Sequence, residues 1–393
     1  MNRVFVTGLG LITSIGQTVE ENWRNLLAGH CGAAEAVRFS GERYQGAPVC
    51  TARFPAPHQD NPYLDNASRI LFATVAEALA GRTDLADAPI YLATTMGGME
   101  QGCRFYRDYQ TNGLTHENKK LLSDYVPYMQ GKNLGGRFGF RRTPVVVCNA
   151  CSSGANALGL ALLALQSGTA PRALVAGFDI VSEFVFGGFN VLRLVSRTGC
   201  RPFDREREGL ILGEGAATLI LETEDSVQQT GRTPIAELCA YAASCDTYHV
   251  TQPHPDGLGA EKVMRDCLHA AAWQSEEVDC LNAHGTGTTH NDLMEAKAAR
   301  RVFADHPDVC LTANKGAIGH TLGAAGAIEA VFSILMLRDG IIPPTLGLRQ
   351  PLEELGPIHL PTQAEARPLR RILSTSYGFG GTNACLAFST GED

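Results

Sequence analysis

The stretch from Val145 to Gly168 reads VVVCNACSSGANALGLALLALQSG and predicts a buried strand that runs directly into a buried helix. Residues 145–148 are apolar, which is typical of a short internal strand. Residues 152–166 are rich in Ala, Leu and Gly and have helical length. Cys151 therefore lies where the strand becomes the helix, among the small residues Ala150, Ser152 and Gly154.

A thiol at the start of a helix is a candidate nucleophile. Free backbone N–H groups and the positive end of the helix dipole favour a thiolate there, so we expect the pKa of Cys151 to lie below its ordinary value. Its small neighbours leave room for a substrate. The alternative is a buried and inert cysteine, which is the usual state of Cys in an apolar run.

Strands and helices alternate along the rest of the chain. The expected strands are 4–8, 90–94, 145–148, 173–176, 217–221, 235–243, 280–282, 309–312, 358–360, 371–376 and 384–388. The expected helices include 67–80, 152–166, 260–272, 293–302 and 324–337. This alternation predicts an α/β fold with largely parallel, buried sheets. The element order repeats after residues 223–234, which indicates a duplication with halves 1–230 and 231–393.

Length and composition limit the function classes. The 393 residues are 44% hydrophobic, enough for more than one ordinary core. The net charge of −8 argues against general nucleic-acid binding. The 12 cysteines lie scattered in apolar segments, which favours reduced thiols and a cytoplasmic location over disulfides. We expect no membrane span, and we interpret the glycine-broken residues 1–16 as a strand and turn rather than a leader.

Three further motifs carry candidate chemistry. NAHGTGTTHND, residues 282–292, places His284 at a strand end, although a loop histidine would look the same. TANKGAIGHTLGAAGAIEA, residues 312–330, holds Lys315 and His320 among small residues, where a lysine needs a partner such as Glu295 or Glu329. This Gly-rich loop lacks nucleotide-binding spacing. SYGFGGTNA, residues 376–384, could supply an oxyanion donor or form a plain hairpin.

Together these motifs resemble the elongating β-ketoacyl-[acyl carrier protein] synthases, the Cys-His-His ketosynthases of the thiolase superfamily. The resemblance spans the chain and includes RVFVTGLGLITSIG (3–16), CNACSSGANALG (148–159), RPFDREREGLILGEGAATLILE (201–222) and SYGFGGTNACLAF (376–388). It implies a thiolase-like fold, in which two duplicated α/β halves form five layers, α-β-α-β-α. It also implies a dimer, as a homodimer or with a related ketosynthase-like subunit.

The resemblance also implies a role for each candidate residue. Cys151 would be acylated, His284 and His320 would be the paired catalytic histidines, and Lys315 would support them with Glu295 and Glu329. Phe379 would be the gate, and its N–H would form the oxyanion hole with that of Cys151. Thr286 and Thr288 would bind the pantetheine arm. Met96 would bound the acyl pocket. No metal or separate cofactor is expected, because substrates arrive on the phosphopantetheine of an acyl carrier protein.

The implied reaction is a decarboxylative condensation of an acyl thioester with malonyl-[acyl carrier protein] in fatty acid, polyene or polyketide elongation. GTGTTHND departs from the family's usual GTST followed by a Pro-x-Gly-Asp turn, so the rim of the pantetheine tunnel is expected to differ. Two alternatives remain. A thiolase would carry a second active-site cysteine where this chain has His320. A chain-length-determining subunit would lack the nucleophile.

Overall fold

The computed structural model describes residues 2–36, 39, 46–56, 61–306 and 308–391. Within them, ten strands form one mixed sheet in the order β11-β10-β14-β15-β9-β1-β8-β6-β4-β5. The N-terminal set comprises β1 (Val4–Thr13), β4 (Ile90–Ala93), β5 (Val145–Val147), β6 (Arg172–Asp179) and β8 (Gly215–Thr223). The C-terminal set comprises β9 (Ala236–Cys245), β10 (Cys280–Asn282), β11 (Cys310–Thr312), β14 (Arg371–Gly378) and β15 (Thr382–Ser389).

The two sets of strands have the same topology. In each set, the strands lie from the outer edge inward as third, second, fourth, fifth and first in chain order. The sets meet through β1 and β9, at the pairs Phe5↔Glu237 and Val6↔Ala236. The repeated order confirms the duplicated architecture. The predicted boundary between residues 230 and 231 falls after α8 (Glu224–Thr230), and the division into units there stays a prediction.

The sheet is mixed rather than largely parallel, so that expectation was wrong. Strand β4 is parallel to β5 and β6, and β10 is parallel to β11 and β14. The inner strands β8, β1, β9 and β15 pair antiparallel. β14 and β15 are joined by residues 379–381 without a helix, and so short a connection can join only antiparallel strands.

Two helices form the middle layer between the halves. They are α6 (Ser153–Gln166) and α12 (Ala325–Asp339), and α12 is buried along nearly its whole length. A Cβ on Gly154 would lie 2.5 Å from the backbone nitrogen of Ala327, and one on Gly326 would lie 2.6 Å from that of Ala155. The glycines therefore let the two helix backbones approach closely.

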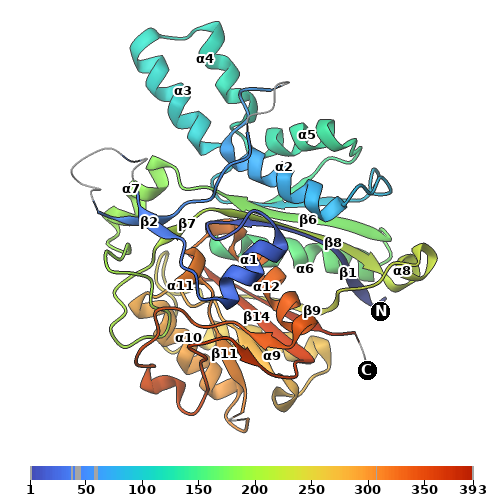
Figure 1. Cartoon of the computed structure of the whole chain (residues 1–393), viewed down its shortest axis with the longest axis vertical. Helices are drawn as coiled ribbons and strands as arrows, with labels where there is room; N and C mark the ends of the chain where they lie inside the picture. Colours follow the sequence, from blue (N-terminus) through green and yellow to red (C-terminus); the bar gives the residue numbers. More distant parts are fainter. Residues whose placement is uncertain (1, 37–38, 40–45, 57–60, 307, 392–393) are drawn as a thin grey trace.

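Outer helices complete five layers (Figure 1). Helix α2 (Asn66–Leu79) packs on the N-terminal strands, and α9 (Leu258–Ala271) and α10 (Thr289–Val302) cover the C-terminal strands. Three hydrophobic clusters fill the spaces, one around the central helices and one under each outer layer. The observed architecture is the expected α-β-α-β-α arrangement.

The remaining elements connect or decorate these layers. A hairpin of α3 (Met99–Asn112) and α4 (His116–Leu121) projects from the body at the top of Figure 1. The other helices are α1 (Val19–Leu27), α5 (Pro127–Phe138), α7 (Glu183–Val191) and α11 (Lys315–Ile318). The small strands are β2 (Ala33–Glu35), β3 (Pro48–Cys50), β7 (Leu212–Gly213), β12 (Ile341–Ile342) and β13 (Glu365–Ala366).

Two predicted elements differ from the structure. Residues 358–360 form no strand and make only an isolated parallel bridge, between His359 and Cys310. The stretch 145–168 contains an extra 3₁₀ turn, Ala150–Ser152, between β5 and α6. An equivalent turn, Leu322–Ala324, precedes α12 in the second half. Each turn begins with a non-glycine residue at positive φ, namely Ala150 at 55° and Leu322 at 54°.

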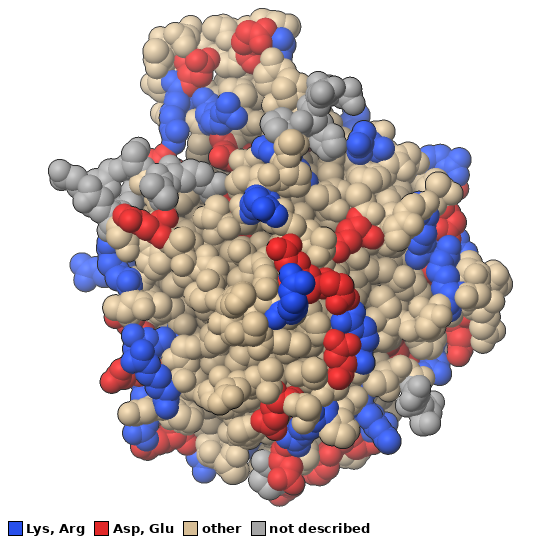
Figure 2. Space-filling view, in the orientation of Figure 1, with Lys and Arg blue, Asp and Glu red and all other residues tan. Residues whose placement is uncertain are grey.

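The surface carries charges of both signs. On the face drawn in Figure 2, basic and acidic residues are interspersed among a larger area of other residues. Among the described residues, no helix combines the length and the apolar character needed to cross a membrane.

Candidate active site

Cys151 occupies the 3₁₀ turn that links β5 to α6, and its side chain is buried. Ser153, the residue after the turn, holds it in place. Its Oγ donates to the Ala150 carbonyl at 2.6 Å and accepts from the Asn149 N–H at 2.9 Å. Positive φ at Ala150 is an uncommon backbone state for a residue with a Cβ. The geometry therefore presents the thiol at the helix start, where the sequence places it.

The ionisation of Cys151 differs from the expectation. Burial raises the pKa of the thiol to about 11, and the Lys315 charge and the Phe379 backbone N–H lower it only in part. The prediction of a lowered pKa was wrong, because desolvation of the thiolate outweighs the Lys315 charge and the Phe379 N–H. The resting group is a thiol, and a neighbouring base is needed to deprotonate it.

His320 lies in position to act as that base. Its Nε2 is 3.1 Å from the Cys151 Sγ. Burial and the Lys315 charge lower the pKa of His320 well below its ordinary value, so the ring is neutral and has an acceptor nitrogen. Its Nδ1 is buried without a hydrogen-bond partner in the described part of the chain.

His284 lies beside His320, with the two ring centroids 5.2 Å apart and the rings nearly perpendicular. The Nζ of Lys315 lies 3.1 Å from the His284 Nδ1 and donates to the His284 carbonyl at 2.6 Å. An ammonium can only donate, so Nδ1 accepts and the ring proton resides on Nε2. Burial and Lys315 also lower the pKa of His284 well below its ordinary value.

Lys315 is fully enclosed and pairs with Glu329. Burial raises the pKa of Glu329 to about 7, and the Lys315 charge opposes that rise. A buried ammonium requires such a carboxylate, since an unpaired charge there would cost several kcal/mol. The pair fixes the ammonium against His284 and explains why a lysine occurs among small apolar residues.

Glu295 holds the loop that carries His284. Its carboxylate accepts from the backbone N–H groups of His284 at 2.8 Å and Gly285 at 2.9 Å, and from Thr375 Oγ1 at 2.9 Å. Burial raises the pKa of Glu295 to about 7. Glu295 therefore acts on the site through the backbone and not through the side chain of Lys315, which pairs with Glu329.

Phe379 reaches Cys151 from the turn between β14 and β15. Its backbone N–H donates to the thiol and lowers the pKa of Cys151. The preceding Gly378 makes this approach possible, since a Cβ there would lie 2.6 Å from Thr382 Oγ1 and 3.2 Å from the Cys151 nitrogen. The Phe379 ring stacks on Phe189 at 5.9 Å.

These groups line one cavity of about 330 Å³. Cys151, His284 and His320 lie along it together with Phe379 and the two threonines 286 and 288. The Oγ1 atoms of these threonines lie 2.8 Å apart. The structure therefore brings the predicted nucleophile, histidines, gate and pantetheine-binding residues into one connected space.

Met96 does not join them. It packs beside a separate apolar cluster that includes Phe186 and Leu322, and it does not line the cavity that holds Cys151. Its backbone N–H donates to Asp179 at 3.0 Å. Its assignment to the acyl pocket stays a prediction.

Two buried carboxylates escaped the sequence analysis. Asp179, at the end of β6, accepts from the N–H groups of Thr95 and Gly323 and so ties the second 3₁₀ turn to the N-terminal half. Asp292 accepts from the backbone N–H groups of Thr286 at 3.0 Å and Phe203 at 2.8 Å. Asp292 is the last residue of the motif 282–292. Its position beside a glycine-rich loop was the signal in the sequence that could have identified it as an acceptor for the loop's N–H groups.

Comparison with known proteins identifies the family. The profiles described as "Beta-ketoacyl synthase, N-terminal domain" and "Beta-ketoacyl synthase, C-terminal domain" match residues 1–226 and 235–349. The chain belongs to the β-ketoacyl synthase family. This β-ketoacyl synthase is 31% identical to the 3-oxoacyl-[acyl-carrier-protein] synthase 2 of Synechocystis sp., over 98% of this chain and 97% of that protein.

Solved structures agree with this assignment. The β-ketoacyl synthase superposes on a chain of the ishigamide ketosynthase/chain length factor with a TM-score of 0.91 and 30% identity, covering both chains completely. A β-ketoacyl synthase from Burkholderia phymatum gives a TM-score of 0.90 at 26% identity, again with complete coverage of both chains. Members of this family are condensing enzymes that transfer acyl groups, and the present synthase is an enzyme of that class.

Proposed function

We propose that this synthase condenses an acyl thioester with malonyl-[acyl carrier protein] and releases CO₂ and a β-ketoacyl-[acyl carrier protein]. The observation that carries the proposal is the convergence of Cys151, His320 and His284 on one cavity, with 3.1 Å between the Cys151 Sγ and the His320 Nε2. A thiol paired with a neutral imidazole is the arrangement needed for acyl transfer to cysteine.

In the first half-reaction, Cys151 takes the acyl group. His320 Nε2 accepts the thiol proton as Sγ attacks the thioester carbonyl, and the departing pantetheine thiol takes the proton back. The carbonyl oxygen becomes negative in the tetrahedral intermediate. The N–H of Phe379, which already lies at Sγ, and the N–H of Cys151 are the donors suited to that oxygen.

In the second half-reaction, the malonyl thioester loses its carboxylate and leaves an enolate. His284 donates from Nε2, because Lys315 holds its Nδ1 as an acceptor. Once Cys151 is acylated, Nε2 of His320 no longer accepts the thiol proton, and a shift of the ring proton from Nδ1 to Nε2 makes His320 the second donor. The enolate carbon then attacks the acyl group on Cys151. Substrates arrive on the phosphopantetheine of the carrier, so the reaction uses no separate cofactor.

Thr286 and Thr288 line the same cavity as the two histidines, which supports their role in holding the pantetheine arm. Asp292 positions Thr286 by accepting from its backbone and side chain, and the Thr286 hydroxyl in turn contacts that of Thr288. Met96 remains the proposed limit of the acyl pocket. Exchange of Met96 for Ala should lengthen the products, and exchange for Trp should shorten them, as measured by product mass.

The partners we propose are an acyl carrier protein and a second ketosynthase-like chain. The relatives are named for an acyl carrier protein, and one solved relative is a ketosynthase/chain length factor. Strand β5 lies at the edge of the sheet with Val145 46% exposed, and Leu163 on the neighbouring α6 is 52% exposed. An apolar, unpaired edge of this kind suits a subunit interface.

The pathway is fatty acid, polyene or polyketide elongation. A cytoplasmic location belongs to the proposal, supported by 12 cysteines that are all free. A thiolase is disfavoured because the second half carries His320 where a second active-site cysteine would be needed. The second candidate, a catalytic subunit that needs a chain-length partner, draws on the ishigamide relative.

Intact-protein mass spectrometry tests the proposal. The synthase is incubated with acyl carrier thioesters of different chain length, then with malonyl carrier, alone and with a candidate partner subunit. We expect acylation at Cys151 and a β-ketoacyl product. Cys148→Ala is the matched control, since this thiol lies three residues away and should not be needed. Acylation that persists in Cys151→Ala would contradict the assignment.

A further inference from the structure

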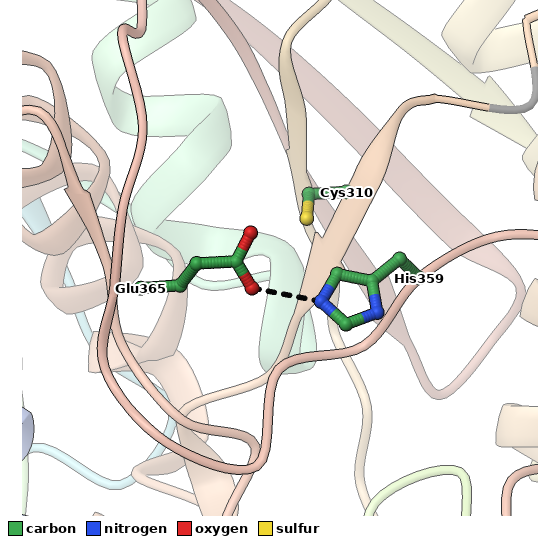
Figure 3. A group of neighbouring side chains, drawn as sticks. All are labelled: Cys310, His359 and Glu365. Atoms are coloured by element: carbon green, nitrogen blue, oxygen red, sulfur yellow. Dashed lines mark hydrogen bonds and ion pairs between the residues drawn. The ribbon is translucent and has the colours of Figure 1, made fainter.

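A second group of reactive side chains lies away from the active-site cavity, at the outer edge of the C-terminal half (Figure 3). Cys310, His359 and Glu365 present a sulfur, a ring nitrogen and a carboxylate oxygen that all lie within 4.8 Å of one another. It is the one such group of potential metal ligands found in residues 2–36, 39, 46–56, 61–306 and 308–391. None of the three lines the cavity that contains Cys151.

Backbone pairing holds the three residues together. Cys310 begins β11, the outermost strand of the sheet, and His359 forms a parallel bridge with it. The N–H of Leu311 donates to the His359 carbonyl at 2.9 Å, which fixes the two segments against each other. Glu365 follows in β13, which pairs with β12. The cluster therefore rests on two strands, β11 and β13, and on a segment that is bridged to β11.

The side chains have the chemistry of a zinc site. Thiolate, imidazole and carboxylate are the three ligand types that Zn²⁺ takes, at about 2.0–2.3 Å each. The His359 Nε2 already lies 2.8 Å from the Glu365 Oε2, and the Cys310 sulfur is aimed toward the same gap in Figure 3. Small rotations would bring all three to one ion. The side chains of His359 and Glu365 are 53% and 42% exposed, so an ion can enter from solvent.

We propose that Cys310, His359 and Glu365 form a structural zinc site, with water as the fourth ligand. Binding exchanges the thiol proton of Cys310 for the ion and releases that proton to solvent. The ring proton that the Nε2 of His359 donates to Glu365 moves to Nδ1, Nε2 then binds the metal, and no electron is transferred. No metal-binding motif predicts this set, because its members are separated by 49 and six positions in the sequence.

Arg367 is the group that competes with the ion. Its Nη1 donates to the Cys310 Sγ at 3.4 Å, and its Nη2 donates to the Asp308 carbonyl. Zinc must displace Nη1 from the sulfur, so replacing Arg367 with Gln should tighten binding.

The site would fasten the segment around His359 to β11. This strand continues directly into Thr312 and, three residues later, Lys315, which supports His284. The ion would sit at the start of the strand and the cavity lies past its end. Bound zinc should therefore raise thermal stability without entering the reaction.

Cobalt(II) is the probe for the test, since thiolate ligation of Co²⁺ gives an ultraviolet charge-transfer band and tetrahedral geometry gives visible d–d bands. The full chain is titrated with Co²⁺ and then with Zn²⁺, which should remove both bands, and bound zinc is counted by equilibrium dialysis. We expect one ion per chain. His359→Gln and Glu365→Gln should each weaken binding about tenfold or more, and Cys310→Ser should abolish the charge-transfer band.

Two controls make the outcome decisive. Cys245→Ser removes an exposed thiol outside the cluster and should leave the bands unchanged. Cys151→Ala removes the other cysteine that faces a histidine and should also leave them unchanged. Because His359 and Glu365 are at the surface, their variants should fold even if Cys310→Ser does not. Bands that survive both surface substitutions, or that vanish in Cys151→Ala, would overturn the proposal, as would the absence of bound metal in the dialysis.

Discussion

At the scale of single residues, the proposed mechanism assigns the acyl chain and the stabilisation of the enolate to different side chains. Sγ of Cys151 faces His320, whereas His284 is oriented by Lys315. Cys151→Ala should therefore take up no acyl group but still release CO₂ from malonyl carrier protein. His284→Ala should retain acylation and lose decarboxylation by about 10²–10³-fold, the typical cost of one such donor. Radiolabelled CO₂ release and intact mass measure the two steps separately.

His320→Ala provides the comparison for that pair. His320 serves the thiol directly, so this variant should lose acylation as well as decarboxylation. If His284→Ala and His320→Ala reduced acylation equally, the assignment of the base to His320 alone would be wrong.

Glu295 gives the stability of the protein a predictable dependence on pH. Its folded-state pKa of about 7 lies above the ordinary value of 4.5, so the folded state holds this proton more tightly than the unfolded chain. The contribution is present below pH 4.5 and is lost as pH rises to about 7. The shift corresponds to about 3 kcal/mol. Urea unfolding at pH 5 and pH 8 should show a smaller difference in Glu295→Gln than in the parent chain.

The quantity to compare is the change in the free energy of unfolding between pH 5 and pH 8. The absolute value is less informative, because the amide of Glu295→Gln faces two N–H donors and lowers stability at every pH. An unchanged difference between the two pH values in Glu295→Gln would contradict the raised pKa of Glu295. Glu276→Gln, which makes the same exchange at an exposed carboxyl, is the matched control.

At the scale of elements, the contact between α6 and α12 tolerates no side chain at its closest point. A Cβ on Gly154 would lie 2.5 Å from the Ala327 nitrogen, so Gly154→Ala must push the helices apart. We expect a loss of about 1–3 kcal/mol in the free energy of unfolding. Gly136→Ala in α5 is the matched control, because nothing lies within 4 Å of a Cβ there. It should raise stability by about 0.5–1 kcal/mol.

Denaturant unfolding of the two glycine variants, with the slope checked for constancy, measures both values. Equal stability of Gly154→Ala and the parent chain would mean that the central helices can separate freely.

The sequence predicts helices and strands well where burial gives the apolar residues a clear spacing or an unbroken run. The run 145–148 and the helix 152–166 correspond to β5 and α6, apart from the 3₁₀ turn that holds Cys151. The hairpin α3–α4 was not predicted, because α3 contributes little to the core: Gln101 is the one residue of this helix that is buried. Residues 358–360 look like a strand but meet β11 through one bridge only.

The candidate catalytic groups were identified because each stands in a distinctive motif, whereas the residues that support them were identified unevenly. Glu295 and Glu329 were expected because a lysine among small apolar residues needs a carboxylate, and the family resemblance gave them the same supporting role. Asp179 was missed because an acid after an apolar strand is unremarkable until the fold brings Gly323 to it. The pKa of Cys151 was predicted in the wrong direction, since burial depends on the packing of both halves and not on local sequence.

At the scale of the whole molecule, the edge strand β5 predicts association. Val145 and Leu163 expose apolar surface next to an unpaired backbone edge. Leu163→Asp should shift the protein toward monomers in sedimentation velocity, while Leu258→Asp, an exposed leucine on α9 of the other half, should not. If Leu163→Asp still formed dimers with the same mass in sedimentation velocity, the interface would lie elsewhere.

The two 3₁₀ turns, Ala150–Ser152 and Leu322–Ala324, have the same shape but unequal contents. The place of Cys151 in the first turn is taken in the second by Gly323, whose N–H is bound by Asp179. If the two halves were identical, both would carry a thiol at the turn and an imidazole beside it. Because one continuous chain carries both turns, the two can differ: in the proposed mechanism the first half supplies the cysteine that carries the acyl group, and the second half supplies the histidines that move protons. Neither half alone contains both the cysteine and the two histidines. Because one chain holds both halves, the two sets of side chains are always made and inherited together.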